Sequence, residues 1–475
     1  MITFIISIIA LLAGYALYSK YLERVMEVDP KRITPANTLS DGVDYVPMPW
    51  WRVFLIQFLN IAGLGPIFGA IAGAMWGPVA FLWIVLGTIF AGGVHDYFSG
   101  MLSVRHDGKS ITEIIGIYLG TQAKQIMRIF AIVLLVLVGV VFISGPAGLL
   151  AGLTPKSFDF TFWVWVIFIY YILATLLPID KIIGKIYPVF GFALVFMAVS
   201  LIIALIVKGY HIPELTGENI KNLHHNKENL PIFPMMFITI ACGAISGFHA
   251  TQSPLMARCL KNEREGRKVF YGAMVTEGVV ALVWAAISMS FFNGINGLNE
   301  MMIAQKGNAA WVVNEVSYSL LGTFGAILAI LGVVAAPITS GDTAFRSARL
   351  TIADLLKTSQ KPIKNRLIIT IPLFAIGFLL TKINFDVIWR YFAWANQTLA
   401  AVVLWTLTVF LWQKKKKSYY LITLIPALFM TAVVTTYIML APEGFSLSKP
   451  VSYSIGVFFV VLTLTLFLIY KRKEK

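Results

Sequence analysis

Charged residues are scarce in this sequence of 475 residues. Asp, Glu, Lys and Arg make up 13% of it and hydrophobic residues 58%, whereas soluble globular domains carry roughly 25% charge. The scarcity excludes an ordinary soluble domain. Apolar stretches of about 20 residues, the length that crosses a bilayer, recur along the whole chain, and the mean hydropathy is +0.80. The sequence therefore predicts a polytopic membrane protein.

Cysteine is almost absent, and an N-terminal leader is not indicated. The two cysteines, Cys242 and Cys259, fall within one apolar segment and at its end, so they do not imply a disulfide framework. The N-terminus has no basic segment and no small-x-small cleavage site. We therefore interpret residues 2–18 as a retained helix and not as a signal peptide.

Motifs of several other functional classes are missing. No Walker A sequence is present, which argues against ATP-driven transport. H-E-x-x-H and G-x-S-x-G are also absent, which argues against a membrane-embedded enzyme. No segment is long enough for a separate regulatory domain, although a channel formed by an oligomer stays open as an alternative. No cofactor and no metal site are expected.

The apolar segments are long and continuous, which favours helices over the alternating strands of a membrane barrel. We therefore expect an all-α polytopic membrane protein with about thirteen transmembrane helices. The expected spans cover residues 2–18, 51–74, 78–102, 126–152, 161–177, 182–207, 232–257, 268–292, 318–345, 366–381, 384–412, 418–440 and 451–470.

Lys and Arg are distributed unevenly between the two sides of these spans. Of the 38 Lys and Arg residues, 28 fall on one side and 7 on the other. Cytoplasmic loops are enriched in such residues. We therefore expect the side with Lys414–Lys417 and the tail Lys471–Lys475 to be cytoplasmic and the N-terminus to be outside. The same asymmetry explains the net charge of +15 without a nucleic-acid partner.

The expected spans divide into two units of opposite orientation. Residues 51–208 begin in the cytoplasm and end outside, whereas residues 231–412 begin outside and end inside. An extra helix (1–20) precedes the two units and a helical hairpin (413–475) follows them. The pattern predicts a five-plus-five inverted repeat.

The first helix of each unit is interrupted near the middle. Gly63, Gly65 and Pro66 interrupt the first, and Gly243 and Gly247 interrupt the second. Glycine disfavours helix and proline removes a backbone donor. Matched interruptions in two repeats point to a transporter binding site, where unwound backbone and half-helix ends meet a charged ligand.

Two polar residues accompany the second interruption, in the stretch TIACGAISGFHATQSP (239–254). We expect Ser246 and His249 to contact the substrate, together with the exposed backbone. The alternative is that the glycines only allow close helix packing, as the stretch Gly69–Gly73 suggests.

Ionisable residues inside spans are functional candidates, because burying charge in lipid is costly. Glu277 lies nine residues after Lys268, or ~13 Å deep at ~1.5 Å per residue. Burial favours the neutral carboxyl, so Glu277 is a candidate proton carrier. The alternative is a structural carboxyl that bonds to a neighbouring helix.

Asp342 shares one helical face with Arg346 and Arg349. The three residues form either an ion pair at the cytoplasmic end of a helix or an inner gate. The pair His95-Asp96 closes the third span, as a proton relay or as a polar cap that faces a loop.

Polar residues also occur in the eleventh span. Arg390 could attract a substrate carboxylate, or its side chain could extend to the membrane surface. Asn396 and Gln397 are candidate substrate contacts.

Five stretches resemble signatures of the carbon starvation protein A family of bacterial inner-membrane transporters. They are IAGLGPIFG (61–69), HDYFSGMLSVRHDGKSI (95–111), TIACGAISGFH (239–249), GDTAFRSAR (341–349) and WRYFAWANQTLA (389–400). The resemblance covers residues 50 to 400 in the family's order. It implies uptake of small carbon sources such as peptides or pyruvate, linked to carbon starvation. It also implies kinship with the amino acid–polyamine–organocation superfamily, whose core is a five-plus-five inverted repeat.

The resemblance to that superfamily implies one further site and has one limit. Hydroxyls of Thr339 and Ser340 could complete a sodium site with carbonyls near Ala62 and Gly63. Longer members of the family carry a His pair where this chain has Ile56 and Gln57. Substrate and coupling ion are therefore not transferred from those members.

The leading hypothesis is a secondary active transporter that takes up a small metabolite by alternating access. Proton coupling is favoured, and sodium coupling is the alternative. Membrane lipid and a small-molecule substrate, a peptide or a small carboxylate, are the expected partners, in the bacterial inner membrane.

Overall fold

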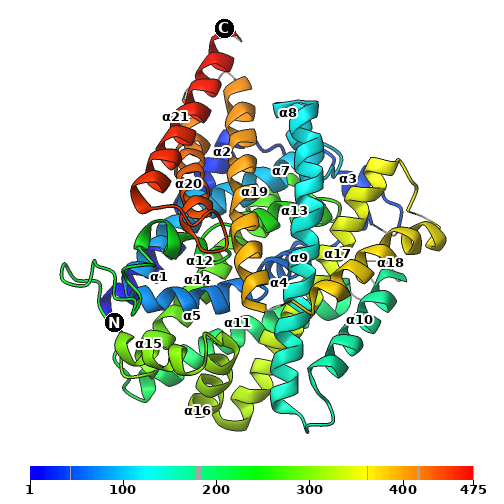
Figure 1. Cartoon of the computed structure of the whole chain (residues 1–475). Coiled ribbons are helices and arrows are strands. Elements are labelled where there is room, and N and C mark those ends of the chain that lie inside the picture. The colour runs from blue at the N-terminus through cyan, green and yellow to red at the C-terminus, as the bar shows by residue number, and fades with distance from the viewer. Residues whose placement is uncertain (43, 177–182, 361, 384, 415–417, 474–475) are drawn as a thin grey trace.

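The structure is a computed structural model that describes residues 1–475 except 43, 177–182, 361, 384, 415–417 and 474–475. Most of the expected lysine run therefore lies outside the described residues. Helices dominate the described part, in which β-structure is limited to the isolated bridges Ile33–Asn262 and Met48–Leu260. The expected all-α fold is confirmed (Figure 1).

The first half of the chain builds one long helix, several medium helices and one broken helix. Its elements are α1 (Ile2–Ala13), η1 (Gly14–Tyr18), α2 (Ser19–Met26), α3 (Pro35–Thr38), α4 (Trp50–Ile61), η2 (Gly65–Gly69), α5 (Ala70–Gly73), η3 (Ala74–Trp76), α6 (Val79–Gly87), η4 (Thr88–Gly92), α7 (Gly93–Arg105), α8 (Ile111–Leu119), α9 (Thr121–Leu153), α10 (Phe160–Leu176) and α11 (Ile183–Val207).

The second half repeats this mixture and ends in two antiparallel helices. Its elements are η5 (Ile232–Met236), α12 (Phe237–Thr239), α13 (Gly247–Ala257), η6 (Glu263–Glu265), η7 (Arg267–Tyr271), α14 (Gly272–Phe291), α15 (Ile295–Ala304), α16 (Ala309–Ala329), η8 (Ile330–Val334), α17 (Ala335–Leu356), α18 (Ile363–Leu380), α19 (Phe385–Gln413), α20 (Leu421–Leu440) and α21 (Lys449–Lys473).

Ten described helices are long and apolar enough to span a membrane, and eleven if one bent pair is counted as a span. Two of the thirteen expected spans fall outside this count for physical reasons. Residues 161–177 correspond to a shorter apolar helix, Phe160–Ala174, and residues 232–257 are interrupted between α12 and α13. The N-terminus and α15 lie toward one end of the molecule and the C-terminus toward the other (Figure 1).

Both expected interruptions are present. In the first, α4 ends at Ile61 and the helix resumes at Gly65 with a bend of 55°. In the second, α12 ends at Thr239, and the backbone at Ser246 is extended, with φ −148° and ψ 126°, before α13 begins at Gly247. The seven residues between α12 and α13 are buried.

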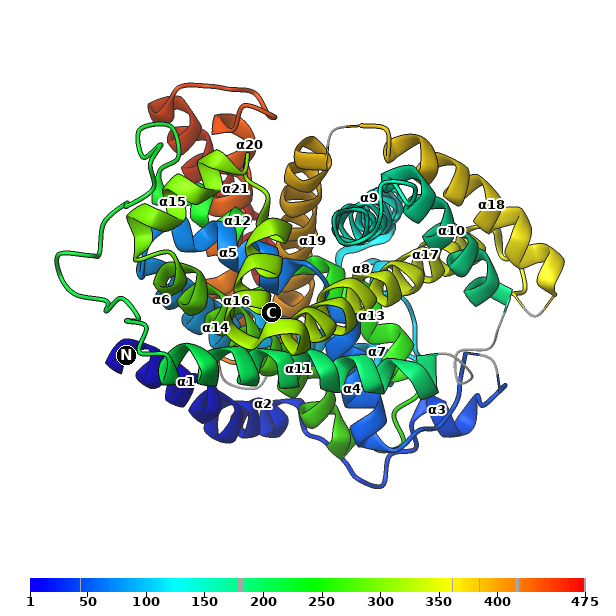
Figure 2. The same cartoon turned by 90° about the horizontal axis from the view of Figure 1, so that it is seen from below.

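The long helix α9 packs against α17, α19 and α10. Viewed from below, α9 is seen nearly end-on beside α10 and α17 (Figure 2). The broken helices lie in the interior, where α4 packs against α11, α13 and α14. This packing encloses both interruptions in protein, which irregular backbone requires inside a membrane.

Candidate functional site

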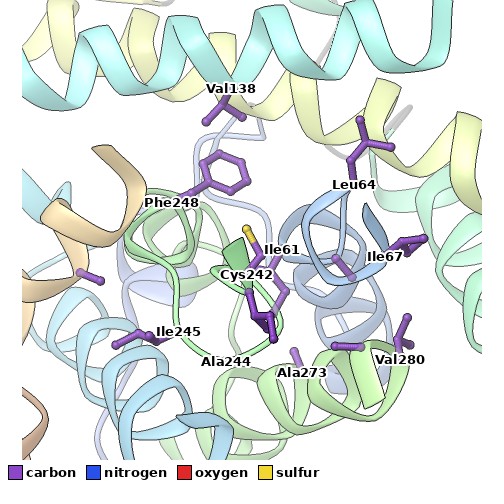
Figure 3. Packing of buried hydrophobic residues seen from close by; sticks show 14 of the residues in the cluster. Ile61, Leu64, Ile67, Val138, Cys242, Ala244, Ile245, Phe248, Ala273 and Val280 are labelled. Carbon is purple, nitrogen blue, oxygen red and sulfur yellow. The ribbon is translucent and has the colours of Figure 1, made fainter. Parts of the chain in front are cut away.

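The two interruptions lie against each other. A side chain added at Gly65 would lie 2.3 Å from Cβ of Cys242, and one added at Gly69 would lie 2.8 Å from the carbonyl oxygen of Thr239. Figure 3 shows Cys242 beside Ile61, with Leu64 on the same broken helix nearby. The glycines of the first interruption therefore allow close packing on the second. The glycines of the first broken helix thus lie at a break in the helix, as expected, and also allow close packing, which was the alternative.

A buried chain of four ionisable side chains lies beside the second interruption. Nδ1 of His95 is 2.7 Å from Oδ1 of Asp96, and Nδ1 of His249 is 2.9 Å from Oδ2 of the same carboxyl group. Nε2 of His249 is 3.4 Å from Oε2 of Glu277. All four side chains are fully buried. Helices α7, α13 and α14 thus bring together four residues that the sequence marked separately.

This arrangement is suited to holding and passing protons. Each imidazole has two ring nitrogens, and His249 faces a carboxyl group with each of them. Neutral imidazole carries its proton on either nitrogen, so a proton can enter at one and leave at the other. The alternative of a polar cap facing a loop is wrong for His95, which lies within α7 and is fully buried.

The N-terminus of α13 is capped by a side chain from α19. Oδ1 of Asn396 accepts hydrogen bonds from the hydroxyl of Ser246, at 3.0 Å, and from the backbone N–H of Phe248, at 2.6 Å. This is the role of an N-cap group. A side chain added at Gly247 would lie 2.4 Å from the carbonyl oxygen of Asn396. In this conformation Ser246 and Gly247 therefore contact α19.

The carbonyl groups of the second interruption are held by neighbouring side chains. The indole N–H of Trp83 donates to the carbonyl of Ile240, at 3.0 Å, and the hydroxyl of Thr88 donates to the carbonyl of Gly243, at 3.1 Å. The amide of Gln397 donates to the carbonyl of Phe237, at 3.0 Å. Trp83 and Thr88 lie in apolar surroundings that gave no sequence signal.

The expected inner-gate group lies on α17, and its two arginines also reach other parts of the chain. Asp342 is buried. Nη2 of Arg346 donates to the carbonyl of Ala174, at 3.2 Å, and its Nη1 is 3.9 Å from Asp44. Nη1 of Arg349 donates to Gln360, at 2.6 Å. The two arginines thus connect α17 to separate parts of the chain.

The hydroxyl of Ser340, from the expected sodium site, contacts the first broken helix. Ser340 donates to the carbonyl of Leu59, at 2.8 Å, and Thr339 donates to the carbonyl of Ala336, at 2.7 Å. Ser340 therefore reaches the last turn of α4, three residues before Ala62. Arg390 instead lies 3.5 Å from Glu443, and its side chain is about half exposed.

A cavity of about 630 Å³ lies beside the first broken helix. Phe68, Ser144 and Gly145 form part of its wall, and Lys306, Asn308 and Trp311 form another part. Aromatic contacts lead from the cavity wall inward: Trp389 contacts Phe392, Phe392 contacts Phe142, and Phe142 contacts Phe248 in the first turn of α13. A row of contacting aromatic side chains thus runs from the cavity wall to the start of α13, which follows the second interruption.

Two further polar residues near the interruptions were missed. Gln57 and Asn60 lie on α4 and are fully buried. Their signal was present, because amide side chains are rare in a span, but Gln57 was named only as a position where longer family members carry a histidine, and Asn60 was not predicted. Within the described part of the chain, no group of three or more His, Cys, Asp or Glu side chains is arranged to hold a metal ion.

Comparison with known proteins identifies the relatives of the chain. The family model "Carbon starvation protein CstA" matches residues 1–154, 151–323 and 310–437. An uncharacterized membrane protein of Haemophilus influenzae is 44% identical over 351 residues, which cover 64% of this chain and 95% of that protein. The peptide transporter CstA of Escherichia coli is 25% identical, with 90% of this chain and 79% of that protein covered.

A second Escherichia coli relative and two solved structures complete the comparison. The pyruvate/proton symporter BtsT is 27% identical over 58% of this chain and 47% of its own length. A Na⁺-coupled sialic acid symporter in a substrate-bound outward-open state has a TM-score of 0.53 at 14% identity, with 96% of each chain covered. A manganese transporter mutant from Eremococcus coleocola has a TM-score of 0.50 at 14% identity, with 91% of this chain and 98% of that chain covered. At such low identity these structures support the fold alone.

Proposed function

The chain belongs to the carbon starvation protein CstA family, and we propose that it is a secondary active transporter that couples uptake of a small metabolite to protons. Its substrate is a peptide or a small carboxylate such as pyruvate, the two classes named for its relatives. The inner membrane of a bacterium is its proposed location.

One observation carries the proposal: the buried chain His95–Asp96–His249–Glu277 is next to the second interruption. His249 is the third residue of α13, so one of the four proton-holding groups belongs to the half-helix that begins at the interruption. A change in the position of α13 would change the distances from His249 to Asp96 and Glu277. Protonation and helix position are therefore linked, which is what coupling requires.

Charge supports an orientation with the N-terminus outside and the C-terminus in the cytoplasm. In that orientation the cavity beside Phe68 faces outward. On the opposite side the buried carboxyl group of Glu263 pairs with two arginines: it lies 2.8 Å from Arg32 and 3.1 Å from Arg105. These features support an outward-facing conformation that is closed toward the cytoplasm.

The division into two inverted repeats, 51–208 and 231–412, is part of the proposal. Each begins with an interrupted helix, and the two interruptions pack on each other. Repeats of this kind place a substrate site at the midplane between them. The extra helix (1–20) and the hairpin (413–475) lie outside this core.

Sodium coupling is the second candidate. Ser340 on α17 bonds to the last turn of α4, and the fold is shared with a Na⁺-coupled symporter. The hydroxyls of both Thr339 and Ser340 donate to carbonyl groups in the protein, and their oxygen lone pairs could still coordinate a cation. The proton is favoured as the coupling ion because of the buried chain that joins Asp96, His249 and Glu277.

Uptake into proteoliposomes tests the proposal. Labelled pyruvate and labelled alanyl-alanine are offered with an imposed inward proton gradient, an inward sodium gradient, or neither. We expect accumulation of one substrate with the proton gradient only. Glu277→Gln should lose accumulation while still exchanging internal for external substrate. If accumulation follows sodium, the coupling ion is wrong, and if Glu277→Gln accumulates normally, the carboxyl is structural.

A further inference from the structure

The inner half of the first broken helix carries two buried amides with unmet hydrogen bonds. Gln57 and Asn60 are fully buried. Neither the oxygen nor the nitrogen of either amide has a hydrogen-bond partner among the residues that the structure describes. The two side chains are three residues apart and so share one face of α4. Asn60 lies two residues and Gln57 five residues before the interruption at Ala62–Leu64.

Such groups are unusual. Buried polar side chains in native proteins nearly always have a partner, because leaving one without costs free energy. Four unmet atoms on one face of one helix need an explanation. A leucine at either position would keep the volume and avoid the cost. The amides are therefore suited to a ligand that enters this region during the transport cycle.

A third amide on the adjoining helix has the same deficit. Helix α13 packs against α4, and Gln252 lies one turn after His249. Its nitrogen donates to the hydroxyls of Thr251, at 3.0 Å, and Ser347, at 3.4 Å. Its oxygen has no partner within the described residues. In total, three amide oxygens lack a donor and two amide nitrogens lack an acceptor.

This balance restricts the chemistry of the ligand. Pyruvate has only acceptor oxygens at neutral pH, so it could meet the two amide nitrogens but would leave all three oxygens without a donor. A peptide offers an ammonium group, an amide N–H and carbonyl oxygens, and so satisfies both kinds of atom. Resting on the proposed function, we propose that Gln57, Asn60 and Gln252 form a subsite that selects peptides over keto acids.

The subsite is occluded in this conformation. Along the first broken helix, Leu64 packs against Gly145 in the wall of the outer cavity, and Phe142 packs against Gly63, three residues after Asn60. Figure 3 shows Leu64 and Ile61 on this broken helix. A peptide from the cavity reaches the amides when the contacts of Leu64 and Phe142 open.

The test compares Gln57→Leu and Asn60→Leu with Thr370→Val. Thr370 on α18 is also buried, and its hydroxyl has no partner in the part of the chain that the structure covers, so it is a matched control outside the subsite. Equilibrium binding of alanyl-alanine to detergent-purified protein is measured for each variant. Proteoliposome uptake of alanyl-alanine and of pyruvate is measured beside it.

We expect wild type and Thr370→Val to bind and transport alanyl-alanine equally. Each leucine variant should bind it about tenfold more weakly, or about 1.4 kcal/mol, with a matching rise in KM and an unchanged response to the proton gradient. If both leucine variants keep the dipeptide affinity within about twofold and gain thermal stability, the amides have no role in recognition. If wild type binds and moves pyruvate but no dipeptide, the subsite is wrong and the transporter assignment stands. If amide-dependent dipeptide binding occurs without gradient-driven uptake, the subsite stands and the coupling is wrong.

Discussion

Asp96 has both carboxylate oxygens occupied by histidines, one from its own helix and one from α13. A buried carboxylate in lipid needs such partners, because an isolated charge there is strongly disfavoured. His249 is the only residue of the four that contacts a carboxyl group on either side. It therefore determines whether Asp96 and Glu277 act as one unit.

Substitution His249→Asn should separate the two carboxyl groups. Asparagine keeps the capacity to hydrogen-bond with Asp96 but cannot carry a proton. We expect gradient-driven accumulation to fall by about 100-fold or more, the size typical of removing a positioned proton-transfer group, and the pH dependence of uptake to flatten. Initial uptake rates across an external pH series measure this.

The matched control is His106→Gln, since His106 lies after the end of α7 and contacts Tyr118 instead. It should leave both the rate and the pH profile unchanged. A His249→Asn protein that accumulates substrate normally would show that His249 only holds the fold together.

At this scale the sequence marked these ionisable residues as candidates but did not indicate that they contact one another. Depth along a helix can be counted from a loop, which is how Glu277 was identified. The direction in which each side chain points depends on how α7, α13 and α14 pack, which a single sequence does not contain. For this reason His95, Asp96, His249 and Glu277 were predicted as separate candidates.

At the scale of elements, the outer half of the first broken helix has two different faces. Gly65, Gly69 and Gly73 are spaced by four residues and pack against residues 239–242. Phe68 and Ala72, on the other face, line the cavity. The face formed by the three glycines packs the outer halves of both broken helices tightly together. The two halves must therefore move together.

Substitution Gly69→Ala should destabilise this body. The added methyl group would lie 2.8 Å from the carbonyl oxygen of Thr239, and backbone cannot move aside as a flexible side chain can. We expect a loss of about 1–3 kcal/mol, as for overpacked cores, seen as a lower melting temperature and slower uptake.

Gly148→Ala on α9 is the control, because no atom lies within 4 Å of an added methyl group there. It should be neutral or stabilising by up to about 1 kcal/mol. Equal melting temperatures for the two variants would show that the two half-helices are not tightly joined.

The loop between α11 and η5 offers a pH-dependent element. The His224 ring lies 4.4 Å from the tilted ring of Trp76 and stacks 4.4 Å from His225, and its Nδ1 accepts a hydrogen bond from the N–H of Asn226. Burial, together with the neighbouring His225, lowers the pKa of His224 to about 4. Trp76 ends the first broken helix, so the loop and that helix are fastened together.

The direction of the pH effect follows from proton binding. Because the folded protein keeps His224 neutral while the unfolded chain binds a proton near pH 6.5, stability falls as pH drops from about 6.5 to about 4. His224→Phe keeps the ring against Trp76 but cannot be protonated, so its melting temperature should fall less over this range. His211→Gln, on the exposed part of the same loop, should behave as wild type. Identical pH curves for all three proteins would remove His224 from this role.

The sequence predicts both where helices form and where they are interrupted, but from different signals. Apolar length indicates a span, while glycine and proline indicate a break. The function of each glycine was only partly predictable. Gly247 and Gly65 were expected to free the backbone for a ligand, whereas their added methyl groups would collide with α19 and with Cys242. Close packing leaves the same sequence signal as unwinding.

For the whole molecule, the expected order of apolar segments is confirmed over the described residues, whereas the orientation and the inverted repeat stay predictions. Orientation depends on the charges of loops relative to a membrane, and no packing contact reports it. The repeat relates two sets of helices whose sequences share little beyond their interruptions. Both are properties of the complete molecule in its bilayer and need an experiment at that scale.

Labelling of single introduced cysteines in intact cells tests the orientation. Cys242 and Cys259 are buried, so the wild-type protein should give a low background with a membrane-impermeant maleimide. Lys227→Cys and Asn308→Cys should label in intact cells, because both residues are exposed and the proposed topology places them outside. Lys261→Cys, equally exposed, should label only after the membrane is permeabilised.

Asn308 also lines the cavity, so its cysteine reports conformation as well as side. In an alternating-access cycle the outer cavity closes when substrate and proton are bound, because the occluded state is stabilised only by its ligands. Substrate at acidic external pH should therefore slow labelling at Asn308→Cys but not at Lys227→Cys. The reverse pattern of labelled sites would invert the topology. Labelling of Asn308→Cys that is unaffected by substrate would mean that this cavity is not the entrance used in transport.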